Sequence, residues 1–175
     1  MFRRIRETGP AGLVPLAWTF TIAAHLSLVT ERSVLIAHLV MDVLLVAFVV
    51  LSWDDMREGV LRAWRTVILV GIPITLAGTA GLLTAAAPGS SPLAAVSVVG
   101  WTFLPVPALW YTGRESTGNA RTVNYAAAAL SALGAVVYLD VTLAGVVPTA
   151  PLRLAGLALV GVGQTVGIVD AVVRY

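Results

Sequence analysis

Six long apolar stretches, separated by short polar or proline-rich segments, restrict the fold of this chain more than any other feature. They run over about residues 12–29, 33–53, 66–87, 93–111, 123–147 and 152–173. Each is close to the ~20 residues that an α-helix needs to cross the hydrocarbon core of a bilayer. None shows the alternation of a lipid-facing barrel strand, so helices are expected. The sequence therefore predicts an all-α membrane protein, a bundle of six transmembrane helices forming a single polytopic membrane domain over residues 1–175.

The composition agrees with a chain embedded in lipid. Only 11% of the residues are charged and 58% are hydrophobic, whereas soluble domains carry about a quarter of their residues as charges. A soluble chain of this length leaves much of its surface in water and cannot hide so much apolar area. The formal net charge of +2 provides no basic stripe for nucleic acid. The predicted partner is therefore the lipid bilayer, and no nucleic acid is expected.

The placement of arginine predicts the orientation in the membrane. If the N-terminus is cytoplasmic, the outer segments hold only Arg32 and Arg153. The inner segments then hold Arg3, Arg4, Arg6, Arg57, Arg62, Arg65, Arg114, Arg121 and Arg174. Cytoplasmic loops are enriched in arginine because its translocation is unfavourable. We therefore expect both termini to be cytoplasmic, in a multi-pass protein of the cytoplasmic membrane.

A tripeptide occurs twice, once in each half of the chain. Trp18-Thr19-Phe20 in the first apolar stretch recurs as Trp101-Thr102-Phe103 in the fourth. Two halves of three spans each would be inverted relative to each other in the membrane, as in many transporters. The halves do not align convincingly beyond this tripeptide. The recurrence raises the hypothesis of a 3+3 inverted repeat.

Two missing residue types exclude several kinds of chemistry. The chain has no cysteine, which excludes disulfides, thiolate metal sites and thiol nucleophiles. It has no lysine, which excludes a Schiff base with retinal or pyridoxal phosphate and a Walker A phosphate loop. No loop is long enough to form a separate catalytic domain. An enzyme is therefore not the expected class.

Two histidines near the first outer turn are the strongest candidates for a functional site. His25 and His38 are equally far from the centre of the turn between Glu31 and Arg32. A rise of 1.5 Å per residue puts both about 10 Å below the outer end of this hairpin. Because the connection is short, the two helices are expected to be antiparallel neighbours. The histidines are then predicted to lie at the same depth, where titratable groups are unfavourable and usually functional.

Other polar and aromatic residues extend this predicted cluster. Asp42 follows His38 by four residues and so shares its helix face. Trp18 shares a face with His25 on the first span, and Asp140 is expected at a comparable depth on the fifth span. Trp101 lies deep enough in the fourth span to line a cavity. We expect these residues to form an ion- or ligand-binding site in the outer half of the bundle.

Three functional interpretations fit the cluster, beside a purely structural one. His25, His38 and Asp42 are suited to a divalent metal, since imidazole and carboxylate ligands bind zinc or iron. Two facing histidines are also suited to haem, as in a membrane redox subunit. Alternatively, the cluster is a proton, ion or solute site in a transporter or channel-like protein. In the structural interpretation, these residues only pair locally and fix the packing.

The sixth stretch suggests helix packing. Gly163-Gln164-Thr165-Val166-Gly167 is a small-xxx-small motif, which lets another helix approach closely. Packing within the chain, a homo-oligomer or a membrane partner subunit would all use this face. A non-catalytic partner subunit or a lipid-binding scaffold is therefore a further hypothesis.

Polar residues near the other spans have simpler explanations. Asp170 precedes Arg174 by four residues near the inner end of the sixth span, which predicts an interfacial ion pair. Asn124, Ser131 and Tyr138 recur every seven residues along the fifth span. This polar stripe is expected to face protein rather than lipid.

Overall fold

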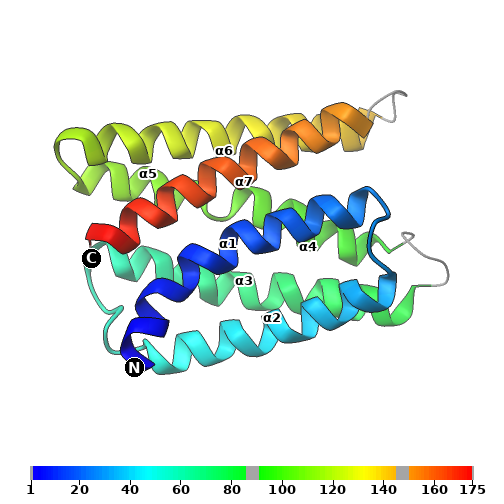
Figure 1. Ribbon diagram of the computed structural model, residues 1–175, viewed down its shortest axis with the longest axis horizontal. Coiled ribbons are helices and arrows are strands. Elements are labelled where there is room, and N and C mark those ends of the chain that lie inside the picture. The colour runs from blue at the N-terminus through cyan, green and yellow to red at the C-terminus, as the bar shows by residue number, and fades with distance from the viewer. Residues whose placement is uncertain (1, 86–90, 145–149, 175) are drawn as a thin grey trace.

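The computed structural model describes residues 2–85, 91–144 and 150–174, and the side chains of residues 9, 11–85, 91–139 and 151–174. All regular secondary structure in this part of the chain is helical (Figure 1). The helices are α1 (Phe2–His25), α2 (Glu31–Leu51), α3 (Gly59–Thr84), α4 (Pro92–Phe103), α5 (Val106–Glu115), α6 (Gly118–Ala144) and α7 (Ala150–Arg174). The predicted all-α class is confirmed.

Five helices of the described chain are long and apolar enough to cross a membrane, which indicates an integral membrane protein. They are Glu31–Leu51, Gly59–Thr84, Pro92–Glu115, Gly118–Leu139 and Pro151–Arg174. The third of these, Pro92–Glu115, counts α4 and α5 together as one span. The apolar part of α1, Ala11–His25, is shorter. Each of the six apolar stretches of the sequence overlaps one of these helices.

The turn between α1 and α2 lies earlier in the chain than expected. The α1 helix ends at His25, and Ser27 adopts a left-handed conformation with φ 57°. The Leu28 N–H donates to the Ala23 carbonyl at 2.9 Å, which closes the end of the helix. The α2 helix then begins at Glu31, after Thr30 accepts a capping bond from the Ser33 N–H.

The fourth apolar stretch is divided into two helices that follow each other. The α4 helix ends at Phe103 and α5 begins at Val106, with Leu104 and Pro105 between them. Pro105 has no N–H to donate into the preceding turn, and its ring crowds the carbonyl four residues earlier. The break is therefore local, and α4 and α5 run on in the same general direction (Figure 1).

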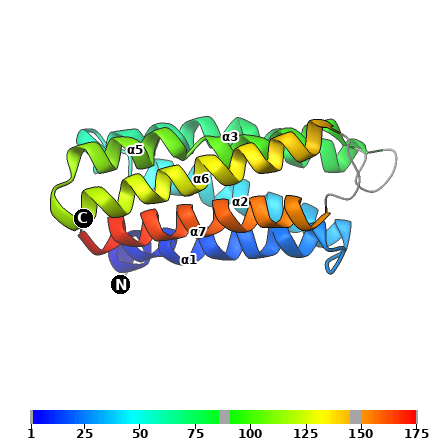
Figure 2. The ribbon, with the colours of Figure 1, turned by 90° about the horizontal axis from the view of Figure 1, so that it is seen from above.

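The helices lie side by side along the long axis of the molecule (Figures 1 and 2). The most extensive contact joins α6 and α7, and α1 packs mainly against α7. The α3 helix contacts both α2 and α4. Consecutive α1 and α2 contact each other little, so the hairpin predicted to hold the candidate site is not a closely packed pair. The start of α1 and the end of α7 lie at the same end of the molecule (Figure 1).

Glycines allow α6 and α7 to approach each other closely. A Cβ atom added at Gly134 would lie 2.5 Å from the Gly156 carbonyl oxygen and 2.7 Å from the Val160 backbone nitrogen. These neighbours are backbone atoms, which cannot move aside as a side chain can. Small residues at helix interfaces are typical of membrane proteins, where van der Waals packing is a main source of helix association. The α6–α7 pair is the most closely packed part of the molecule.

We expect Gly134→Ala to destabilise the protein by about 1–3 kcal/mol, as overpacking usually does. The new methyl group would force apart the backbones of α6 and α7. The measurement is thermal unfolding in detergent micelles, followed by circular dichroism. Gly12→Ala is the matched control, because a Cβ there meets nothing within 4 Å. An unfolding midpoint for Gly134→Ala at or above that of the control would contradict the close approach.

Candidate functional site

Asp42 is a buried carboxyl group with only one of its oxygens paired. It lies near the middle of α2 and is 9% exposed. The Thr79 hydroxyl of α3 donates to Asp42 Oδ2 at 2.6 Å. Among the described residues, Asp42 Oδ1 has no hydrogen-bond partner. An acidic side chain at membrane depth is unfavourable by about 2.5–3.5 kcal/mol on insertion scales, so this half-paired carboxyl group marks a candidate site.

His38 lies one turn from Asp42 and also faces α3. Its Nδ1–H donates to the Val34 carbonyl at 3.0 Å. The neutral ring therefore has a bare Nε2, which is able to accept a proton. A Cβ added at Gly78 of α3 would lie 2.8 Å from this Nε2 and 2.7 Å from the Ser97 Cβ of α4. The imidazole thus lies against the α3 backbone, in a place that only glycine leaves open.

His25 belongs to a different part of the molecule. Its Nδ1–H donates to the Thr21 carbonyl at 2.9 Å, and its Nε2 accepts from the Tyr138 hydroxyl of α6 at 3.0 Å. The two rings meet edge to face, with centroids 5.7 Å apart. His25 is the last residue of α1, whereas His38 lies two turns inside α2. The predictions that the two histidines share a depth and face each other are therefore wrong.

The prediction that the histidines lie together assumed that α1 and α2 pack closely against each other. In the structure α1 packs against α7, which directs His25 toward α6, while α2 packs against α3. No three His, Asp or Glu side chains in the described part of the chain lie close enough together to hold a metal ion. The structure therefore does not gather His25, His38 and Asp42 as a set of metal ligands, and haem binding stays a prediction. Asp140 belongs to α6, but its side chain lies outside the described residues.

Both predicted tryptophans take part in one hydrogen-bonded network in the core. The Trp18 indole N–H donates to Gln164 Oε1 of α7 at 3.0 Å. Gln164 Nε2 donates to the Trp101 carbonyl at 3.0 Å and, more weakly, to the Thr102 carbonyl at 3.4 Å. The Trp101 indole N–H donates in turn to Thr75 Oγ1 of α3 at 2.9 Å. The network links α1, α7, α4 and α3, and it holds Trp18 and Trp101 by their polar atoms.

The break at Pro105 explains why Gln164 is needed. In an uninterrupted helix, the Trp101 carbonyl would accept from the N–H of residue 105, which proline lacks. A free carbonyl in hydrocarbon is unfavourable, and a neighbouring helix must then provide a donor. Gln164 provides it while its oxygen accepts from Trp18. The small-xxx-small motif predicted only helix packing for Gln164. The proline four residues after Trp101, which leaves the Trp101 carbonyl without its helical donor, was a signal that another helix must provide one.

The predicted polar stripe on α6 faces protein. Asn124, Ser131 and Tyr138 are buried, with exposed fractions of 0%, 0% and 5%. Asn124 Nδ2 donates to Asp170 Oδ2 at 2.8 Å, and the Arg174 Nε donates to Asp170 Oδ1 at 2.8 Å. The stripe and the Asp170–Arg174 ion pair are both confirmed. Asp170 has both of its oxygens paired and so differs from Asp42.

The small residues of α7 pack within the chain. A Cβ added at Gly163 would lie 2.5 Å from Ser131 Oγ, and one added at Gly167 would lie 2.2 Å from a Leu109 methyl carbon. Both glycines are buried. The α6 and α5 helices therefore already occupy the Gly163/Gly167 face, and an oligomer or partner subunit, which stays a prediction, would need another surface.

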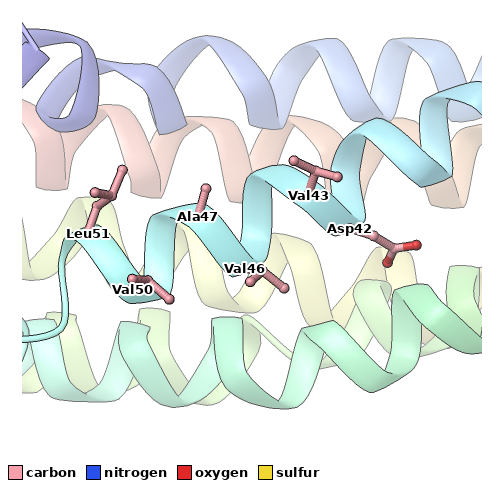
Figure 3. Close-up of a pocket in the computed structure, with 6 residues that line it drawn as sticks. All are labelled: Asp42, Val43, Val46, Ala47, Val50 and Leu51. Atoms are coloured by element: carbon pink, nitrogen blue, oxygen red, sulfur yellow. The ribbon is translucent and has the colours of Figure 1, made fainter.

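A shallow apolar groove runs along the outer side of α2 and ends at Asp42 (Figure 3). Its volume is about 570 Å³. The residues that line it are Asp42, Val43, Val46, Ala47, Val50 and Leu51. All six residues belong to α2, and the Asp42 carboxyl group is turned to Thr79 of α3, with its unpaired oxygen buried.

Comparisons of the chain with protein-family models, with curated proteins and with solved structures find no match. The function is therefore argued from the geometry of the buried polar groups. The most distinctive of these are the half-paired Asp42 carboxyl group and the bare nitrogen of His38.

A double-mutant cycle tests the Trp18–Gln164 bond. We expect Trp18→Phe and Gln164→Leu to show a coupling energy of about 0.6 kcal/mol and at most about 1.7 kcal/mol, the mean and the maximum found for hydrogen bonds between membrane helices. The measurement is unfolding in mixed micelles. Trp18→Phe with Thr112→Val is the control cycle, because Thr112 accepts from Trp64 and lies outside this network. Equal coupling in the two cycles would show that the Trp18–Gln164 bond contributes nothing specific.

Proposed function

We propose that this protein is a small membrane transport protein in which Asp42 and His38, both on α2, exchange protons where α2 packs against α3. The observation that carries the proposal is the buried Asp42 carboxyl group, paired to Thr79 through one oxygen and unpaired at the other. Titratable groups inside membrane spans are typical of proton relays in pumps and transporters. His38, with its bare Nε2 one turn away, is a second group that can accept a proton.

In neither protonation state do both oxygens of Asp42 have a hydrogen-bond partner among the described residues. When the carboxyl group is ionised, the described residues provide it with one hydrogen bond but no ion pair. When it is protonated on Oδ2, its O–H can donate to the Thr79 hydroxyl, and Oδ1 still has no partner among the described residues. A group that is incomplete in both states is poorly suited to a purely structural role, since buried polar groups are normally fully paired. It is suited to a site that gains and loses a proton.

A proton fits this site better than a metal cation. In the described part of the chain, Asp42 has a hydrogen bond from Thr79, and no three acidic or histidine side chains gather to hold a metal ion. Calcium takes six to eight oxygen ligands, and magnesium requires a nearly octahedral set. A carboxyl group and an imidazole need no such shell to exchange a proton.

We further propose that the helices form six spans with both termini in the cytoplasm, in the cytoplasmic membrane. Two observations support this topology. The start of α1 and the end of α7 lie at the same end of the molecule (Figure 1), as an even number of spans requires. The arginines of the sequence are concentrated on the side that holds these termini, which is the side expected to face the cytoplasm.

The contacts of the two tryptophans also support a 3+3 inverted repeat. Trp18 opens the repeated tripeptide in the first half and bonds Gln164, on the last helix of the second half. Trp101 opens it in the second half and bonds Thr75, on the last helix of the first half. The packing of α1 against α7 is thus paralleled by that of α4 against α3. Transporters built from inverted repeats move one part against the other around a site near the membrane centre.

Asp42→Asn tests the proton site. The amide oxygen can still accept from Thr79, so the hydrogen bond is kept while the titrating group is removed. In proteoliposomes with an imposed pH gradient and a trapped pH-sensitive dye, we expect the wild-type protein to carry protons. The variant should carry none beyond protein-free liposomes. The infrared carbonyl band of a protonated carboxyl group should be present in acidified wild-type protein and weaker in the variant.

Glu115→Gln is the matched control for this experiment. It removes one carboxylate from the exposed end of α5 and should leave the flux unchanged. Wild-type flux in Asp42→Asn would reject the site. If the wild-type protein carried no protons and showed no titrating carboxyl band that depends on Asp42, the scaffold or partner-subunit hypothesis would replace transport.

Cysteine labelling tests the topology, and the chain is suited to it because it contains no cysteine. We expect Leu28→Cys, in the exposed α1–α2 turn, to react with a membrane-impermeant maleimide added to intact cells. Thr117→Cys, at an exposed position in the turn before α6, should react only after the cells are permeabilised. The opposite pattern would reverse the orientation, and equal labelling of both positions in intact cells would contradict the number of spans.

A further inference from the structure

The face of α2 that meets α3 is polar on one side of Asp42 and apolar on the other. His38 lies one turn from Asp42 toward the α1–α2 turn, which is the outer end of the helix in the proposed topology. Toward the inner end, Val49 is the other buried residue of α2. The α3 helix runs antiparallel to α2 (Figure 1), so its buried Val67, twelve residues before Thr79, lies level with this inner half. The titratable neighbour of Asp42 in this contact is therefore on its outer side.

Polar groups that could carry a proton onward are distant or engaged on the inner side. Along α2 the next polar side chain in that direction is Ser52, ten residues or about 15 Å from Asp42. Thr75 of α3 is engaged, because its hydroxyl donates to a backbone carbonyl of its own helix and accepts from the Trp101 indole. A proton on Asp42 thus meets an apolar contact between α2 and α3 on the inner side of this structure.

Gly78 of α3 leaves the space that the His38 ring occupies. A Cβ atom added at Gly78 would lie 2.8 Å from both Nε2 and Cδ2 of His38, and 2.7 Å from the Ser97 Cβ of α4. The ring cannot turn away and also keep the bond from its Nδ1–H to the Val34 carbonyl. An alanine at this position would therefore displace the imidazole, α4 or both.

We propose that Asp42 exchanges protons with the outer side of the membrane through His38, and that Gly78 is the positioning residue for the imidazole. The inference rests on the proposed proton exchange at Asp42, and it specifies the side of exchange. Nε2 of the neutral ring takes up a proton from the outer side and forms the imidazolium. Transfer of that proton to the ionised Asp42 carboxylate restores the neutral ring and leaves a neutral carboxyl group. Side chains four residues apart on a helix are neighbours, with Cβ atoms about 5–6 Å apart.

The helices around His38 bring few charged groups near it. The α3 helix carries no titratable side chain over residues 66–84, and α4 carries none over residues 92–103. The α1 helix contacts α2 little, and its His25 is bonded to Tyr138. The other charged or titratable groups in the outer half of α2 are Glu31, Arg32 and Asp42. Proton flux through His38 is therefore expected to follow the pH of the outer side.

Gly78→Ala tests the positioning role in the proteoliposome assay of proton flux. We expect the flux to fall by about 10- to 100-fold, since a displacement of 1 Å can cause a loss of this size at a reaction site. The infrared band of Asp42 should remain, which shows that the variant is folded and keeps its titrating carboxyl group. Gly100→Ala is the matched control, because its Cβ would meet the Ile74 side chain and not His38. This control should carry protons as the wild-type protein does.

A double-mutant cycle with His38→Ala separates positioning from packing. We expect His38→Ala to lower the flux as Gly78→Ala does, and the two together to cause no further loss. Gly78→Ala should also lower the unfolding midpoint less in the His38→Ala protein, because the imidazole is no longer there to be displaced. Equal losses of flux and stability in both backgrounds would assign Gly78 to packing against Ser97 and overturn its positioning role.

Cysteine accessibility tests the side of exchange. His38→Cys and Val49→Cys are each treated with a membrane-impermeant methanethiosulfonate reagent, in intact cells and in inside-out vesicles. We expect His38→Cys to react in intact cells alone, and Val49→Cys to react in neither preparation. Reaction of His38→Cys in neither preparation, or only in inside-out vesicles, would overturn the outer route. Reaction of Val49→Cys in inside-out vesicles would overturn the closed inner half.

The outcomes separate this inference from the proposed function. Wild-type flux in Gly78→Ala, with flux still lost in Asp42→Asn, would reject the positioning role and leave Asp42 as the proton site. If Gly78→Ala does not fold, the flux of His38→Ala decides, and a wild-type value would overturn the route through His38. Absence of both proton flux and the Asp42 infrared band in the wild-type protein would reject the proposed function, and this inference with it.

Discussion

A polar group inside a bilayer has no water to bond, so each one must find its partner within the protein. Many hydroxyl groups in the described part of the chain meet that requirement within their own helix. Thr75, Thr112 and Ser131 each donate to the carbonyl four residues earlier on the same helix. Groups that cannot be satisfied in this way determine which helices meet. Gln164 is the clearest case, because its amide joins α7 to both α1 and α4.

Helix packing differs between two parts of the molecule. The α6 and α7 helices approach each other closely through small residues, although Asn124 Oδ1 on α6 and Arg153 Nε on α7 have no hydrogen-bond partner among the described residues. The α2 helix is mostly exposed along its length and is joined to α3 through the Asp42–Thr79 bond. The incompletely paired carboxyl group lies on this more exposed helix.

Local properties of the chain could be predicted from its sequence, and the choice of neighbours could not. Apolar length and breaker residues indicated the helices, and four-residue spacing indicated the Asp170–Arg174 pair. Spacing also placed His38 and Asp42 on one face, because both residues lie on the same helix. The partner of His25 is 113 residues away in the chain, and no local pattern encodes that contact. Thr79 and Gln164 were missed for the same reason, because their roles depend on residues of other helices.

The hydrogen bonds of Gln164 have a consequence for biosynthesis. The chain is made from its N-terminus, so α4 enters the membrane while α7 is still untranslated. Until then the Trp101 carbonyl and the Trp18 indole lack their final partner. The translocon, a chaperone or residual water must accommodate them during this interval. A truncation that removes α7 would therefore leave two separate helices, α1 and α4, each with an unpaired polar group.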